Sequence, residues 1–203
     1  MSPESADGRP AEGPYSKVRT QGGDVFFRFL RQSHIFSSAV REILGARLLR
    51  EVTPLPLTIA QFHLLKLMLI DGTHRVGKVA DFLGVSPPAA TKSVDKLERL
   101  DLLVRLPSKG DRRATLLSVS SKGRRLVRRY EELKAARLAP ILESFDPEEV
   151  RLLTQLLERF AVSLLKQQES RNDLCLHCAG YLSEDCSVGL VRGGCPHEKV
   201  RGR

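Results

Sequence analysis

The residues best suited to chemistry are four cysteines, and all of them lie in the last part of the chain. They follow the spacing Cys-x2-Cys-x7-Cys-x8-Cys-Pro. A Cys-x-x-Cys pair presents two thiolates to one metal centre, and two more thiolates within reach complete a four-sulfur site. The sequence therefore predicts a metal site whose ligands are Cys175, Cys178, Cys186 and Cys195.

Zinc and an iron–sulfur cluster both accept four thiolates. Zinc sites of this kind usually have two short cysteine pairs, whereas only the first pair is short here. A cysteine followed directly by proline is typical of ferredoxin-like cluster-binding segments, and long glycine-containing spacers suit a bulky cluster. We therefore expect a [4Fe-4S] cluster. The alternatives are Zn2+, where His177 or His197 could replace a cysteine, and a disulfide or free-thiol sensor.

The chain around these cysteines has 203 residues and a net charge of +9. This length suits one domain with appendages, and the positive charge favours an anionic partner, most commonly nucleic acid. No apolar run approaches the ~20 residues that a membrane span needs, and no secretory signal pattern is present. We expect a cytoplasmic protein with no membrane partner, in which clustered cysteines stay reduced and hold metal.

The stretch from Thr73 to Ser120 has the pattern of two short helices and a hairpin. Gly84 ends the first helix, and Val85 is expected to fill the core as the apolar residue of the turn. Ser86 and Pro87 then suit the N-cap and the first position of the second helix. The apolar face of that helix comprises Ala90, Val94, Leu97 and Leu100. Its exposed face comprises Thr91, Lys92, Asp95, Lys96 and Arg99.

Two short apolar runs, 102–106 and 114–119, follow this helix and flank turn residues, as in a β-hairpin. The turn carries one acid, Asp111, against three cations: Lys109, Arg112 and Arg113. Such a tip suits contact with phosphates or with the minor groove. Together these elements predict a winged helix-turn-helix that lays its second helix in the major groove of duplex DNA.

The chain resembles the MarR family of winged-helix regulators over about residues 24 to 168. The resemblance rests on Val79-Ala80-Asp81-Phe82-Leu83-Gly84-Val85-Ser86, Thr91, Leu97-Glu98, Leu102-Leu103-Val104-Arg105, Asp111-Arg112-Arg113 and Leu117-Ser118-Val119-Ser120-Ser121-Lys122-Gly123. Asp101 stands where the family usually has glycine, and aspartate tolerates a left-handed helix end. The resemblance implies a homodimer in which the first and last helices of two subunits pack together. The cysteine-rich segment is not part of the common family pattern, although some MarR-type regulators carry a [4Fe-4S] cluster as a redox sensor.

We therefore expect a mainly α fold with a small β wing, long N- and C-terminal dimerisation helices and a metal-binding tail. The expected parts are a disordered tail (1–22), an N-terminal dimerisation helix (23–52), a winged helix-turn-helix DNA-binding domain (53–120), C-terminal dimerisation helices (121–170) and a Cys-rich tail (171–203). Thr58 and Gln61 suit a capping box at a helix start after two prolines. Ser121 is expected to cap the helix that follows the hairpin, and Asp146 the last helix.

The expected function is a DNA-binding transcriptional regulator that binds a pseudo-palindromic operator as a homodimer. DNA contacts are expected from Ser86, Thr91, Lys92, Lys96, Lys109, Arg112 and Arg113. A [4Fe-4S] cluster would tune DNA binding as a redox or iron sensor. If the tail holds zinc, it is a static clip, and the effector is a small molecule between the dimer helices and the DNA-binding lobe.

An electron-transfer or redox protein is a further alternative. The sequence has no Gly-rich nucleotide loop, no Ser/His/Asp set in a recognisable context and no second cluster motif. We therefore predict no catalytic residues and no enzyme activity.

Overall fold

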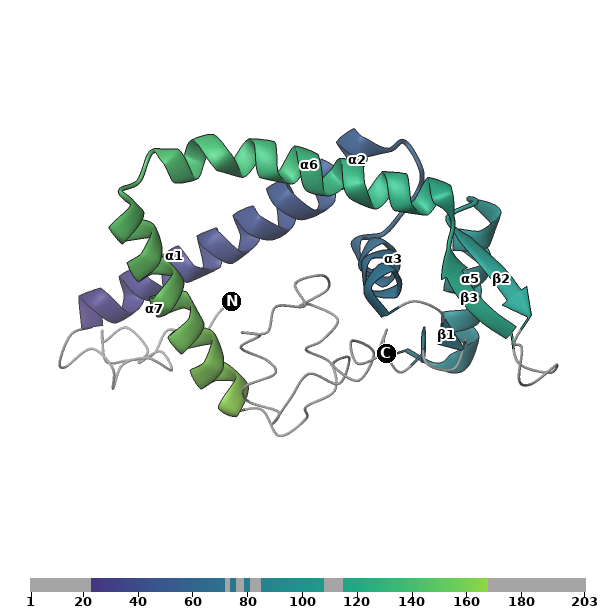
Figure 1. Ribbon diagram of the computed structural model, residues 1–203. Helices are drawn as coiled ribbons and strands as arrows, with labels where there is room; N and C mark the ends of the chain where they lie inside the picture. The colour runs from purple at the N-terminus through teal and green to yellow at the C-terminus, as the bar shows by residue number, and fades with distance from the viewer. Residues whose placement is uncertain (1–22, 72–73, 76–78, 81–84, 108–114, 168–203) are drawn as a thin grey trace, which may run out of the picture. The chain divides into compact units, whose positions relative to one another are not determined.

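The computed structural model describes residues 23–71, 74–75, 79–80, 85–107 and 115–167 (Figure 1). The described part of the chain is mainly helical and carries one small antiparallel sheet. It divides into two compact units, one ending at Leu44 and the other starting at Gly45. The prediction of a mainly α fold with a small β wing is confirmed.

The first unit contains α1 (Gly23–Ala39) and the beginning of a π-helical segment, η2 (Val40–Arg47). A helix was predicted here, but its π-helical part was not, because apolar spacing over two turns does not separate i→i+5 from i→i+4 bonding. Large apolar side chains remain exposed along this segment, including Phe29, Phe36 and Ile43. Large apolar side chains exposed along one segment suit contact with a partner surface.

The second unit opens with α2 (Leu48–Val52) and α3 (Ile59–Asp71), and Pro54 and Pro56 separate the two helices. The predicted capping box at the start of α3 is confirmed. The Thr58 N–H donates to Gln61 Oε1, and the Gln61 N–H donates to Thr58 Oγ1, both at 3.2 Å. The largest fully buried side chains come from α2, α3, α5, the sheet and the segments beside them: Leu48, Phe62, Leu64, Leu65, Met68, Val79, Val94, Leu97, Leu102, Leu103, Leu117 and Val119.

The sheet consists of β1 (His74–Arg75), β2 (Leu103–Pro107) and β3 (Thr115–Val119) in the order β1-β3-β2. β2 and β3 are the two arms of the predicted hairpin, and Leu103 pairs with Val119. β1 was not predicted, because a strand of two residues has no measurable period. Its pairing with β3 widens the sheet on the side away from β2.

Two helices complete the second unit: α6 (Ser121–Glu143) and α7 (Pro147–Lys166). The prediction that Ser121 caps α6 is wrong. The N-cap is Ser120, whose Oγ accepts a hydrogen bond of 3.0 Å from the Gly123 N–H. Two adjacent serines are equivalent in the sequence, and only the path of the chain out of β3 decides between them. Asp146 caps α7 as predicted, with the capping box closed by Glu149.

No side chain of α7 is buried. Among the helices that the structure describes, none combines the length and the apolar character that crossing a membrane requires.

Candidate nucleic-acid interface

The helix predicted to read DNA is α5 (Pro87–Arg99), and it is amphipathic in the expected sense. Ala90, Val94 and Leu97 are completely buried. Ser86 occupies the N-cap and Pro87 the first turn, as predicted, but the Ser86 side chain makes no capping hydrogen bond. The Ser86 hydroxyl is exposed together with the N-terminal end of the helix, so it remains available to an external partner.

The prediction for Val85 is wrong, because its side chain is 41% exposed. The Val85 N–H donates a hydrogen bond of 3.2 Å to the Ala80 carbonyl oxygen. Val79 and Ala80 are themselves buried and supply the apolar surface on this side of the core. Val85 therefore does not belong to the buried core.

The exposed side of α5 carries the other predicted contact residues of this helix. Thr91 is exposed, and its hydroxyl donates a hydrogen bond of 3.0 Å to the Pro87 carbonyl oxygen. Its oxygen lone pairs can still accept a bond from outside. Lys92 is exposed and Lys96 half-buried, and neither pairs with a carboxylate in the described part of the chain.

A groove with a volume of about 610 Å3 runs along this side of α5. Its lining combines three cations with one acid and two polar residues: Lys92, Lys96, Arg99, Asp95, Ser93 and Gln61. Sequence reasoning left Arg99 out of the DNA-contact set. Its spacing of three and seven residues from the two lysines places all three on one helical face, which is the signal that could have found it.

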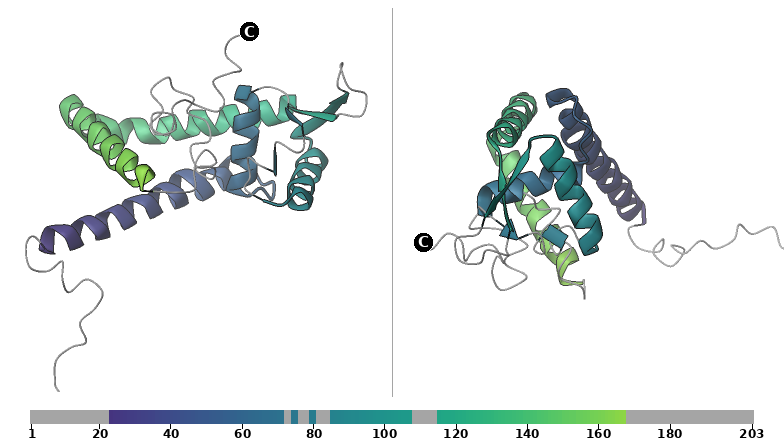
Figure 2. Two further views of the ribbon diagram at one scale, coloured as in Figure 1. Left: turned by 90° about the horizontal axis from the view of Figure 1, so that it is seen from below. Right: turned by 90° about the vertical axis from the view of Figure 1, so that its right-hand side faces the viewer.

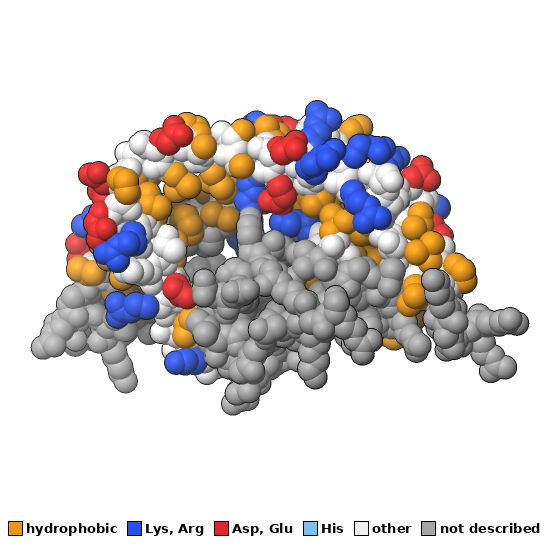
Figure 3. Space-filling view, viewed as in Figure 1, with side chains coloured by type: hydrophobic (Ala, Val, Ile, Leu, Met, Phe, Trp, Pro, Cys, Tyr) orange, Lys and Arg blue, Asp and Glu red, His pale blue; other side chains and the backbone are white. Residues whose placement is uncertain are grey.

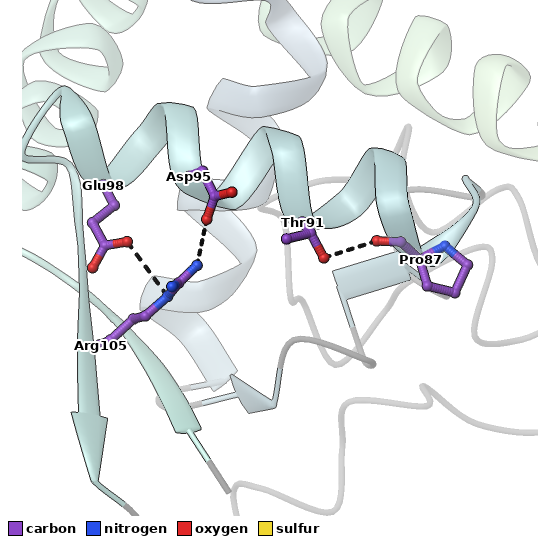
Figure 4. A network of polar contacts seen from close by, with 5 residues as sticks. All are labelled: Pro87, Thr91, Asp95, Glu98 and Arg105. Atoms are coloured by element: carbon purple, nitrogen blue, oxygen red, sulfur yellow. Dashed lines mark hydrogen bonds and ion pairs between the residues drawn. The ribbon is translucent and has the colours of Figure 1, made fainter.

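The wing is attached to α5 through a side chain that the sequence showed only as part of a family pattern. β2 packs along α5, and Arg105 of β2 reaches two carboxylates on that helix (Figure 4). Its Nη2 lies 2.5 Å from Asp95 Oδ1, and its Nε lies 3.4 Å from Glu98 Oε2. This contact links a side chain of the wing strand to the exposed side of α5. Figure 2 shows the two strands beside α5 from two further directions.

A second basic surface covers the part of α6 that follows the sheet (Figure 3). Its exposed members are Lys122, Arg124, Arg125, Arg128 and Arg129. Lys122 lies 3.7 Å from an oxygen of Asp101, and Arg128 lies 3.8 Å from Glu132. The other three arginines have no carboxylate partner among the described residues. They add to the positive potential of the unit that carries α5.

Several predicted residues lie outside the described part of the chain. They are the wing-tip cations Lys109, Arg112 and Arg113, the cysteines Cys175, Cys178, Cys186 and Cys195, and the histidines His177 and His197.

Comparison with known proteins shows which family this chain resembles. The profile of the MarR family matches residues 57–115. The HTH-type transcriptional regulator MhqR of Bacillus subtilis (strain 168) is 29% identical over 103 residues, which is 51% of this chain and 71% of that protein.

Solved structures of similar fold support this similarity. The crystal structure of RV1404 from Mycobacterium tuberculosis is similar with a TM-score of 0.60 and 28% identity, covering 66% of this chain and 91% of that one. A mutant of S. aureus MepR, bound to an oligodeoxyribonucleotide, has the same fold at a TM-score of 0.52 and 17% identity, covering 67% of this chain and 97% of that one. Over residues 57–115 the chain is thus similar to the MarR family, and its described part shares the winged helix-turn-helix fold of these solved structures.

Proposed function

We propose that this protein binds a pseudo-palindromic operator in duplex DNA as a homodimer, with α5 of each subunit in a major groove. The observation that carries this proposal is the exposed face of α5. Three cations without carboxylate partners among the described residues line a groove there, and strand β2 of the wing packs alongside. MepR, which shares the fold, has been captured on an oligodeoxyribonucleotide.

The contacts divide by chemistry. Ser86 and Thr91 offer hydroxyl groups to base edges near the start of α5, while Lys92 and Lys96 offer charge to bases and nearby phosphates. Lys109, Arg112 and Arg113 at the wing tip would hold the flanking backbone or minor groove.

Selection of duplexes from a random library tests the proposal. The selected sites should show two-fold symmetry, with half-sites about one turn of DNA apart. Arg113→Ala should weaken binding to the selected duplex and lower the slope of log affinity against log salt by about 0.9. Arg151→Ala on α7 is a matched control, because Arg151 pairs with Glu148 on its own helix. Recovery of no duplex, or of duplexes without symmetry, would contradict the proposal.

Exposed apolar surface supports the homodimer. α7 presents Leu152, Leu153, Leu156, Leu157, Phe160 and Leu164 to solvent, each more than two-fifths exposed. A stripe of this length on a helix without any buried side chain needs a partner surface. A second copy of the chain supplies an equivalent stripe by symmetry.

We further infer that Cys175, Cys178, Cys186 and Cys195 hold a [4Fe-4S] cluster. The support is chemical: four thiolates, one short pair and a Cys-Pro ending suit a cluster better than they suit zinc. The cysteines follow α7 in sequence, so the redox or iron state of the tail could alter the proposed dimer surface and thereby DNA affinity.

Purification without air, followed by a visible spectrum and metal analysis, tests this inference. A brown protein with about four irons and four sulfides per chain, bleached by oxygen, is the expected result. Cys178→Ser should lose the colour and any response of DNA affinity to oxidant. A colourless protein with one zinc would overturn the cluster and make the tail structural, and the effector would then be sought among small molecules.

A further inference from the structure

Asp95 lies close to several cations, and its ion pair is formed with only one of them. It lines the groove together with Lys92, Lys96 and Arg99. It lies three residues after Lys92 and four before Arg99, the spacings at which opposite charges pair along a helix. Its carboxylate nevertheless bonds to Arg105 of β2, at 2.5 Å. The one acid that lines the groove therefore pairs with an arginine of the wing strand and not with Lys92 or Arg99 of its own helix.

Arg105 is well suited to hold that position. Its guanidinium lies between two carboxylates one helical turn apart, Asp95 and Glu98 (Figure 4). A planar guanidinium with several N–H donors can bond both at once, which a lysine ammonium does with less directional control. The second carboxylate fixes the arginine on the wing side of α5.

The ion pairs of Arg105 with Asp95 and Glu98 contribute little to the free energy of folding. The side chains of Arg105, Asp95 and Glu98 are 39%, 47% and 39% exposed. Ion pairs at such exposure contribute on the order of 0–1 kcal/mol to folding. The main consequence of this pairing is therefore the charge that α5 presents to its surroundings.

We propose that Arg105 is a positioning residue for DNA binding, an inference that rests on the DNA-binding function proposed above. By holding Asp95 on the wing side, Arg105 leaves Lys92 and Arg99 available to the phosphates of the DNA backbone. Without Arg105, the Asp95 carboxylate turns to one of these cations and cancels one positive charge in the groove.

The test uses the full-length protein and labelled duplex DNA of random sequence, to which phosphate contacts supply essentially all of the affinity. Affinity is measured over a salt series for the wild type, Arg105→Gln, Asp95→Asn and the double variant. Arg105→Gln should weaken binding roughly tenfold and lower the salt slope by about one, the effect of one lost phosphate contact. The double variant should recover the wild-type affinity and slope, because the acid that would cancel the cation is gone.

Recovery in the double variant separates positioning from direct contact. If Arg105 itself touches phosphate, the double variant keeps the slope lower by about one, and the proposal is overturned. The proposal is also overturned if Arg105→Gln binds the duplex with the affinity and salt slope of the wild type. A wild-type protein that does not bind duplex DNA would instead refute the proposed function.

Two controls exclude a loss of folding. Arg105→Lys keeps the positive charge and should retain the wild-type slope. Arg151→Gln removes a more exposed arginine from its carboxylate partner on α7 and should leave affinity unchanged. Thermal unfolding of each variant is followed in parallel, and the shifts should be small, as expected for exposed ion pairs.

Discussion

The ammonium group of Lys122 donates a hydrogen bond of 2.9 Å to the backbone carbonyl oxygen of Leu100, joining the start of α6 to the end of α5. The Ser120 hydroxyl donates to the Asp101 carbonyl oxygen at 2.5 Å, and Asp101 has a φ of 57°. The Ser120 N–H donates to the Leu102 carbonyl oxygen at 3.0 Å. The first turn of α6 therefore cannot shift relative to the end of α5 without breaking these bonds.

Gly123 makes this joint possible. A Cβ at this position would lie 2.5 Å from the Leu102 carbonyl oxygen and 2.7 Å from Val119 Cγ1. Gly123→Ala should lower the free energy of unfolding by about 2 kcal/mol through overpacking. The gain of about 1 kcal/mol in helix propensity does not offset this cost, because the obstructing oxygen belongs to the backbone.

Urea unfolding measures the Gly123→Ala effect. Arg125→Ala, at an exposed site two residues further on, should change stability by no more than about 0.5 kcal/mol. Equal stability of Gly123→Ala and the wild type would show that the chain relaxes around the new methyl group.

Local chemistry made much of this fold predictable. Thr58 with Gln61 and Asp146 with Glu149 form capping boxes whose partners are three residues apart, so the sequence contains the whole interaction. The buried face of α5 follows directly from its three- and four-residue spacing. The wing arms follow from two apolar runs around a turn.

The errors arose where the packing of separate elements decides the environment of a side chain. Val85 is apolar, yet its exposure depends on how Val79 and Ala80 are buried. Arg105 lies ten residues after Asp95 in sequence, and their pairing depends on how β2 packs against α5. No period or cap encodes such a cross-element pair, so this part of the candidate site needed the structure.

Lys66 on α3 and Glu131 on α6 form an ion pair in which the lysine side chain is only 7% exposed and the glutamate side chain 36%. Glu131→Gln leaves a buried ammonium with a weaker partner. We expect a loss of about 2 kcal/mol, below the range for fully buried pairs because Glu131 reaches solvent. Lys66→Met should cost less, since it removes the buried charge and keeps the apolar volume. Denaturant unfolding compares the two variants, and a larger loss for Lys66→Met would contradict this account.

The buried phenol of Tyr130 should make the folded protein less stable at alkaline pH. Burial, reinforced by the carboxylate of Glu131, raises the pKa of its phenol to about 12 from an ordinary value of 10.0. The folded state favours the neutral phenol, so this contribution to stability is complete below pH ~10 and is lost as the pH rises towards ~12. Tyr130→Phe should flatten the fall of the urea midpoint over that interval. Parallel curves for the two proteins would exclude Tyr130 as the cause.

The exposed stripe of α7 gives a direct test of the proposed homodimer. Leu156→Glu places a charge within the apolar stripe, where pairing with a second copy would desolvate it at a cost of several kcal/mol. Analytical ultracentrifugation should therefore report a dimer for the wild type and the 22.6 kDa monomer for this variant. Affinity for a two-fold symmetric duplex should fall as well, because one subunit engages only one half-site. Gln155→Glu adds the same charge at an adjacent exposed polar position and should remain dimeric. A Leu156→Glu protein that still sediments as a dimer would mean that α7 is not the interface.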